Sequence, residues 1–165
     1  MFLNDVKHHT KTDWVNEELF DLNQAKPIII DETNQLIGNH NTYFLHIQNK
    51  KTTICAWKIS LYDLVNGKYE VSYLINIFDS VELGHIGIAL ESFIRNYQGK
   101  DKNLFRNKVF RNTDQFIASL LGFSITHYQQ LKKIINYCSD ELIEKIRAKK
   151  IRIAAAADYL PFNQR

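Results

Sequence analysis

Hydrophobic residues in the first part of the chain form short runs that are typical of strands. Apolar runs occupy residues 27–30 and 36–37, and a third run, residues 52–59, is rich in β-branched and aromatic side chains; polar turn residues follow the first run. Between the second and third runs, residues 39–48 carry apolar side chains at helical spacing. Strands of this length combined with a helix predict a small α/β unit, which we place at residues 1–80.

The stretch at residues 69–78 fits two structures. Asn66-Gly67 is typical of a hairpin turn, and a strand would explain the alternating apolar residues behind it, Val71, Tyr73, Ile75 and Ile77. The same residues also fit a mostly buried helix, and we favour the strand. A helix over about residues 13–22 is expected upstream.

Hydrophobic residues recur at helical spacing through residues 81–165. Separate helices are expected over residues 86–97, 140–148 and 153–160, and two shorter ones within residues 113–133. The predicted fold class is therefore α+β, in which a small amino-terminal α/β unit is followed by an all-helical domain.

Residues 113–133 have the pattern of a helix-turn-helix. Gly122 supplies the positive φ that ends the first helix, and Ser124 is placed to cap the second. Thr113 or Asp114 is expected to cap the first helix. Apolar residues at helical spacing are expected to face the core: Phe116, Ile117, Leu120, Leu121, Tyr128, Leu131, Ile134 and Ile135.

The polar residues of the second helix are of the types that bind DNA. A helix-turn-helix lays its second helix in the major groove, where hydroxyl and amide groups read base edges and cations contact phosphates. The residues expected at the bases or at the helix start are Ser124, Thr126, His127, Gln129 and Gln130, and those expected at phosphates are Arg111, Lys132, Lys133 and Lys149. An ordinary helical hairpin with the same glycine is the alternative.

Positive charge gathers around this motif. The whole chain carries a net charge of +3. Residues 1–94 hold 7 Lys/Arg against 12 Asp/Glu, whereas residues 95–152 hold 13 Lys/Arg against 5 Asp/Glu. Such asymmetry is typical of a polyanion-binding half, and it favours DNA binding over a solvated basic face on an ordinary bundle.

Other features of the sequence limit the class of protein. The sequence contains no run of 18 apolar residues and no signal-peptide core, so no membrane segment is expected. Cys55 and Cys138 form neither a disulfide framework nor a zinc pattern, and their apolar neighbours predict buried free thiols. We expect a cytoplasmic protein without a metal site.

Two stretches resemble the ParB-like proteins of plasmid partition and chromosome segregation. Residues 27–41 are similar to that family's amino-terminal strands and Gly box, and residues 116–160 are similar to its helix-turn-helix and the helices that follow. The resemblance covers about residues 25–160. It implies an amino-terminal domain related to ParB and sulfiredoxin, a DNA-binding helical domain, and a role in partition or transcription regulation.

Gly38-Asn39-His40-Asn41 occupies the place of the family's Gly box. The resemblance implies a nucleotide site at these four residues, Gly38, Asn39, His40 and Asn41. However, Asn41 stands where the second arginine of the box is expected, and Asp79 replaces the arginine of another family region. Because a carboxylate repels phosphate, we expect no nucleotide cofactor bound by the family's chemistry.

Three functions follow, in order of preference. The first is a non-catalytic protein that reads a specific DNA duplex, as a homodimer or with a partner protein, because a single helix-turn-helix covers little DNA. The second is a nucleotide-binding enzyme, for phosphoryl transfer or nuclease chemistry, that uses the amino-terminal pocket. Its candidate carboxylates would be Asp31, Glu32 and Asp79, although turn or surface roles are more typical of such residues. The third is an adaptor whose basic helical half docks an acidic protein.

Overall fold

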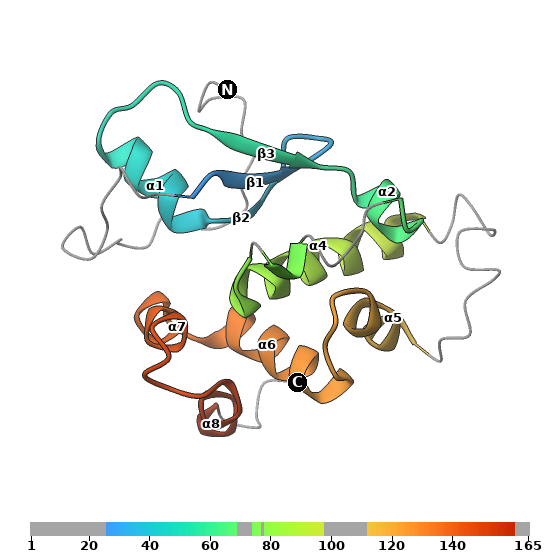
Figure 1. Cartoon of the computed structure of the whole chain (residues 1–165). Coiled ribbons are helices and arrows are strands. Elements are labelled where there is room, and N and C mark those ends of the chain that lie inside the picture. Colours follow the sequence, from blue (N-terminus) through green and yellow to red (C-terminus); the bar gives the residue numbers. More distant parts are fainter. Residues whose placement is uncertain (1–25, 69–73, 77, 98–111, 161–165) are drawn as a thin grey trace. The chain divides into compact units, whose positions relative to one another are not determined.

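The computed structural model describes residues 26–68, 74–76, 78–97 and 112–160 of the chain (Figure 1). The helix expected over residues 13–22 and the phosphate contact expected at Arg111 lie outside the described residues. The chain divides into two compact units, Met1–Leu61 and Tyr62–Arg165.

The first unit contains a three-stranded sheet with the strand order β2-β1-β3. Its strands are β1 (Ile28–Asp31), β2 (Leu36–Gly38) and β3 (Ala56–Ile59). The central strand β1 pairs antiparallel with β2 and parallel with β3. Ile28, Ile29 and Ile30 are all buried because β1 is covered on both faces, which explains its continuous apolar run.

Two polar residues shape the turns of this unit. The Asp31 carboxylate accepts hydrogen bonds from the backbone N–H of Thr33 and of Gln35, both at 2.8 Å, and so closes the turn between β1 and β2. Helix α1 (His40–Gln48) follows β2 and contacts β1. Asn39, just before α1, adopts a φ of 56° and donates its side-chain amide to the Pro27 carbonyl at 2.5 Å.

The strand expected over residues 52–59 is shorter than predicted, because β3 includes only Ala56–Ile59. The expectation of a buried Cys55 is wrong, since this thiol is exposed while the preceding Ile54 is buried. Side chains alternate between two faces in this extended segment, so apolar neighbours in sequence do not bury Cys55. Cys138 is half-buried.

The second unit is helical. Its helices are α2 (Leu61–Val65, beginning at the last residue of the first unit), α4 (Ser80–Tyr97), α5 (Thr113–Leu120), α6 (Ile125–Tyr137), α7 (Asp140–Arg147) and α8 (Ile153–Tyr159). Helix α6 is central, because it contacts α4, α5 and α8 (Figure 1). Val81, Ile134, Ile143, Ile146, Ala156 and Ala157 form one buried cluster among these helices.

The strand favoured within residues 69–78 is wrong where the structure describes this stretch. Residues 74–76 are helical, and the Phe78 N–H donates to the Leu74 carbonyl at 3.0 Å, as in a helical turn. Leu74 and Phe78 are buried while Ile75 is exposed. Burial of two residues four positions apart is typical of one face of a helix. The apolar residues at every second position had suggested a strand instead.

The predicted α+β class is confirmed by the described sheet and helices. None of the described helices is long and apolar enough to cross a membrane.

Candidate nucleic-acid interface

A sharp turn at Gly122 separates α5 from α6. The turn is closed by a hydrogen bond from the Phe123 N–H to the Ala118 carbonyl at 2.8 Å, and Gly122 has a φ of 74°. This is the bonding pattern of a Schellman motif, in which glycine avoids the penalty for positive φ. Ser124 then caps α6 by accepting a hydrogen bond from the His127 N–H at 3.2 Å. The two-helix geometry predicted around Gly122 is confirmed.

The cap of α5 differs from the prediction. Asn112, rather than Thr113 or Asp114, is the N-cap, and its side chain accepts a hydrogen bond from the Gln115 N–H at 2.8 Å. Sequence alone could not separate three adjacent residues that all favour this position. Because Asn112 caps the helix, the Asp114 carboxylate is available for contacts with α6.

One face of α6 packs into the core and another is exposed. Tyr128, Leu131 and Ile134 are fully buried. The start of the helix exposes Ser124, Ile125, Thr126 and Gln129, whereas His127 and Gln130 are half-buried. The His127 ring lies 5.0 Å from the Phe123 ring, between centroids, which orients it at the edge of the exposed face. The exposed residues occupy the first turns of α6, where a recognition helix meets base edges.

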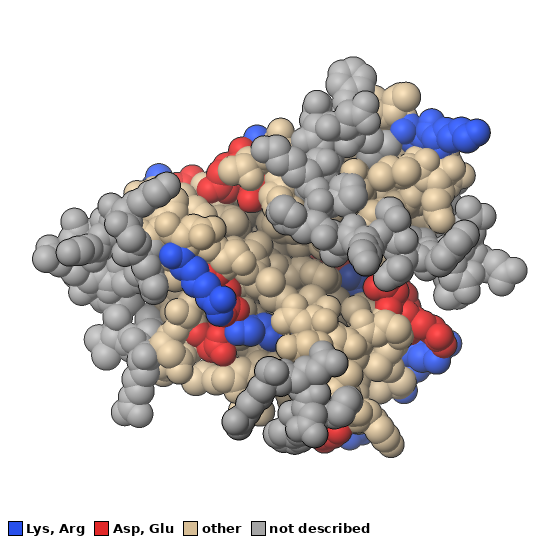
Figure 2. Space-filling model, turned by 180° about the vertical axis from the view of Figure 1, so that it is seen from behind, with Lys and Arg blue, Asp and Glu red and all other residues tan. Residues whose placement is uncertain are grey.

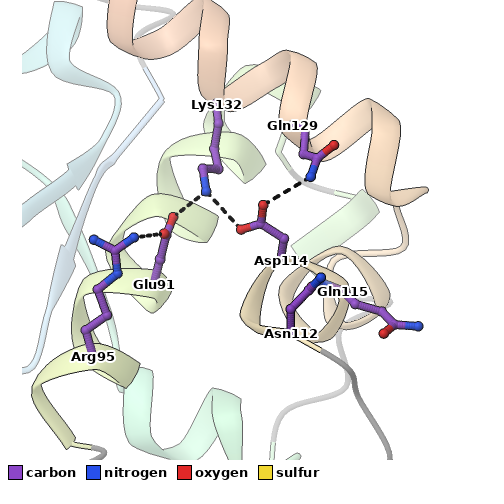
Figure 3. Close-up of polar contacts among 7 residues, drawn as sticks. All are labelled: Glu91, Arg95, Asn112, Asp114, Gln115, Gln129 and Lys132. Carbon is purple, nitrogen blue, oxygen red and sulfur yellow. Dashed lines mark hydrogen bonds and ion pairs between the residues drawn. The ribbon is translucent and has the colours of Figure 1, made fainter. Parts of the chain in front are cut away.

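Lys132 lies in a cluster of charges that joins three helices (Figure 3). Its ammonium group lies 2.7 Å from the Glu91 carboxylate of α4 and 2.9 Å from the Asp114 carboxylate of α5. Burial alone would lower the pKa of Lys132, but the hydrogen bonds to Asp114 and Glu91 and their negative charge outweigh this and raise it. The expected phosphate contact by Lys132 therefore needs correction, because both carboxylates already neutralise this cation.

Replacement of Lys132 by methionine is expected to lower the free energy of unfolding by about 1–2 kcal/mol, because Glu91 and Asp114 would lose a shared, partly buried partner. Chemical denaturation followed by circular dichroism measures this loss. In the same variant, the slope of log K for DNA binding against log salt should be unchanged. Replacing a lysine that contacts a phosphate would instead make this slope shallower by about one.

Lys133 also contacts its own domain. Its ammonium group donates to the carbonyl oxygens of Ala157 at 2.7 Å and Leu160 at 3.1 Å, at the end of α8. A cation at this position satisfies carbonyl groups that the helix leaves unpaired. The expected phosphate contact by Lys133 is corrected to a structural role, because α8 packs against this side of α6.

A cavity of about 390 Å³ lies beside α6 within the second unit. It is bounded by the start of α4, by His127 and Gln130 of α6, by the end of α7, and by the turn that leads into α8. Its lining residues are Asp79, Ser80, Val81, His127, Gln130, Ile146, Arg147, Lys149, Ile151, Arg152, Ile153 and Ala154. The turn between α7 and α8 thus lies on the same surface as α6.

This turn exposes three cations, Lys149, Lys150 and Arg152, which we call the basic turn. Within the part of the chain that the structure describes, their side chains form no ion pair. Lys149 has a φ of 57°, and the Lys150 N–H donates to the Lys145 carbonyl at 2.9 Å. These bonds close α7 in another Schellman motif and hold the turn in a defined backbone geometry.

Arg147, although it lines the cavity, is part of the core. It pairs with Glu82 of α4, whose side chain is 2% exposed, and lies 3.6 Å from the Glu144 carboxylate. The neighbouring His85 is half-buried, and the pKa of its imidazole is lowered to about 4. Burial is the main cause and the positive charge of Arg147 the second, while the negative charge of Asp79 raises the pKa in part. Arg147 therefore neutralises a buried carboxylate and is not assigned to a ligand.

Several of the other described cations form ion pairs with carboxylates. On the face drawn in Figure 2, several blue Lys and Arg side chains lie next to red Asp and Glu side chains. Arg95 pairs with Glu91, and Lys145 lies 2.6 Å from Glu141. The basic turn differs from these paired cations because, among the described residues, none of its three side chains forms an ion pair.

The amino-terminal box has structural contacts of its own. Gly38 and Asn39 are buried, His40 and Asn41 are half-buried, and the Asn39 amide is bonded to the Pro27 carbonyl. The three carboxylates considered for metal chemistry each accept backbone hydrogen bonds: Asp31 from its turn, Glu32 from the Leu61 N–H, and Asp79 from the first residues of α4. No group of His, Cys, Asp and Glu suited to a metal ion occurs among the described residues.

Three exposed residues beside the predicted ones were not assigned to the site from the sequence: Ile125, and Lys150 and Arg152, which were counted only in the basic charge around the motif. Ile125 was overlooked because hydrophobic residues are assigned to the core by default. Local spacing gave no signal for this exposure, because Ile125 precedes the buried Tyr128 by three positions, a spacing that favours the same face of a helix.

Comparison with known proteins gives a distant likeness. No protein-family model matches the chain, and no curated protein matches it. A solved structure described as the C-terminally truncated chromosome-partitioning protein ParB from Caulobacter crescentus, complexed to the centromeric parS site, aligns with a TM-score of 0.35 and 14% identity. The alignment covers 94% of this chain and 81% of that chain. A likeness at this level assigns neither a family nor a function to the present chain.

Proposed function

We propose that this protein binds double-stranded DNA, with the start of α6 in the major groove and the basic turn on the adjacent phosphates. The observation that carries the proposal is the arrangement around the cavity, where Lys149 and Arg152 line the same hollow as His127 and Gln130 of α6. A groove-reading helix needs cations beside it, because contacts to phosphates position the helix while contacts to base edges select the sequence.

The exposed side chains of α6 divide these tasks. Thr126 and Gln129 are exposed in the first two turns of the helix, and Gln130 and His127 lie toward the cavity. A glutamine side chain can bind adenine through two hydrogen bonds, and a threonine hydroxyl can donate or accept at several bases. The Gln129 amide also lies 3.4 Å from the Asp114 carboxylate, which limits its rotation (Figure 3). Base reading is therefore proposed for Thr126, His127, Gln129 and Gln130.

Removal of two cations of the basic turn is expected to weaken binding to every duplex. The double variant Lys149→Asn/Arg152→Gln should lose at least about tenfold in affinity near 0.1 M salt, and its slope of log K against log salt should become shallower by about two. Asparagine is chosen at Lys149 because it tolerates the positive φ there. Fluorescence anisotropy across a range of salt concentrations measures both effects.

The matched control removes two cations that are already paired. Lys68 lies 2.8 Å from Asp63, and Lys145 lies 2.6 Å from Glu141. The variant Lys68→Gln/Lys145→Gln changes net charge by the same amount, so it should retain most of the affinity and a slope close to that of the parent. Equal losses in both variants would indicate a general charge effect and would contradict the assignment of the basic turn.

We further propose that the bound site is a specific sequence and that the biological role is partition or transcription regulation. One short recognition helix covers a few base pairs, so a homodimer on a palindrome, or a second DNA-bound partner, would supply the remaining affinity. Selection of bound duplexes from a random pool tests this directly. A recovered palindrome supports the dimer, and a pool without any enriched sequence would contradict specific recognition.

A further inference from the structure

Ile125 is a hydrophobic residue exposed within a polar surface. It is the first residue of α6 and is 37% exposed, and its sequence neighbours Ser124 and Thr126 are also exposed. The three apolar residues that follow at core spacing, Tyr128, Leu131 and Ile134, are fully buried. Ile125 therefore does not continue the core face of α6.

The position of Ile125 is held by its surroundings. Ser124 caps the helix through the His127 N–H, and Gly122 and Phe123 close the preceding turn through hydrogen bonds to α5. A β-branched side chain in a helix has one strongly preferred χ1 rotamer, so its methyl groups have a defined direction. Ile125 thus presents a rigid apolar surface at the end of the helix that is proposed to enter the groove.

Duplex DNA offers one apolar feature in the major groove, the 5-methyl group of thymine. The first residues of a recognition helix are those that meet base edges. Polar base edges cannot bond to an isoleucine, and burying this side chain against them would leave their groups unsatisfied. A thymine methyl is the groove surface that Ile125 complements.

We propose that Ile125 is a specificity-determining residue that packs against the 5-methyl group of a thymine in the bound site. The inference rests on the proposed DNA binding and adds to it the chemical identity of one base pair. The basic turn, which lines a cavity with His127 and Gln130 of the same helix, supplies the charge that attracts a duplex to α6. The exposed methyl of Thr126 is smaller and is attached to a hydroxyl, so it is the weaker candidate for this contact.

The test compares duplexes that differ only in methyl groups. A duplex enriched from the random pool is resynthesised with uracil in place of thymine at one position at a time, which removes the methyl and keeps the base pairing. At one position the parent protein should lose about fourfold in affinity, the factor expected from one methyl-sized group no longer buried. The Ile125→Ala variant should bind the thymine duplex more weakly and should no longer distinguish thymine from uracil there.

Two further measurements sharpen the result. Ile125→Val keeps the branched methyl groups nearest the backbone and should retain much of the discrimination. Thermal unfolding of both variants shows whether each is folded under the binding conditions, so that a loss of discrimination is not confused with a loss of folded protein.

The outcomes separate the two proposals. If the parent binds its selected duplex tightly but responds to uracil at no position, the Ile125 contact is overturned and DNA binding stands. If Ile125→Ala retains the full preference for thymine, the contact is again overturned. If the protein binds no duplex even at low salt, the proposed function and this inference are overturned together.

Discussion

Replacement of Arg147 by methionine is expected to lower the free energy of unfolding by about 3 kcal/mol. Arg147 is the cation paired with Glu82, whose side chain is 2% exposed, while its own side chain is 17% exposed. Without the guanidinium group, the Glu82 carboxylate would remain among apolar residues with its principal positive partner removed. Chemical denaturation at neutral pH, followed by circular dichroism, measures the change.

Lys145→Met is the matched control, because Lys145 lies on the same helix and pairs with the exposed Glu141. Its loss should stay below about 1 kcal/mol, as is usual for surface ion pairs. The double variant Glu82→Met/Arg147→Met removes both buried charges and should recover much of the lost stability. Similar losses for Arg147→Met and Lys145→Met would show that the pair between α4 and α7 has no special energetic role.

The imidazole of His85 provides a second measure of the same variant. The charge of Arg147 is one cause of its lowered pKa, after burial. In folded Arg147→Met, the pKa of His85 should therefore rise from about 4 but remain below its ordinary value of 6.5, because burial persists. A proton NMR titration measures this shift.

Alanine at Gly87 is expected to destabilise the fold by about 2 kcal/mol. A Cβ atom at Gly87 would lie 2.5 Å from Cε2 of Tyr128 and 3.1 Å from Cδ1 of Leu121. Both of these residues are fully buried, so neither can move aside without disturbing the packing of α4 on α5 and α6. The clash should outweigh the gain of about 1 kcal/mol in helix propensity. Thermal and chemical unfolding both measure the effect.

Gly84 offers a matched control on the same helix. A Cβ atom there would lie 2.6 Å from Cδ1 of Ile135, the far end of a flexible and half-buried side chain. That methyl can rotate away, so Gly84→Ala should remain within about 1 kcal/mol of the parent. If Gly87→Ala proved as stable as Gly84→Ala, the close approach of α4 to Tyr128 would not limit this core.

Much of the local structure could be predicted from the sequence. Gly122 and Ser124 mark the end of one helix and the start of the next, because positive φ and side-chain capping are demanded by the backbone itself. The burial of Tyr128, Leu131 and Ile134 follows from helical periodicity. The residues near 74–76 were assigned wrongly, because a short apolar stretch fits both periods until its packing partners are known.

The roles of the charged residues were decided by tertiary structure. The pattern of a single helix places Lys132 and Lys133 away from its core stripe, and on that basis both were expected at phosphates. In the fold, the Asp114 carboxylate of α5 and the Glu91 carboxylate of α4 approach Lys132, and the end of α8 approaches Lys133. Which cations remain exposed depends on how neighbouring helices pack.

The sequence by itself determined the α+β class, the positions of most described helices and strands, and the sharp turn before α6, because these depend on residues close together in the chain. Only the tertiary structure placed Lys149 and Arg152 of the basic turn beside α6, and only it left Ile125 outside the core. Those two results depend on contacts between residues far apart in sequence, for which local periodicity carries no information.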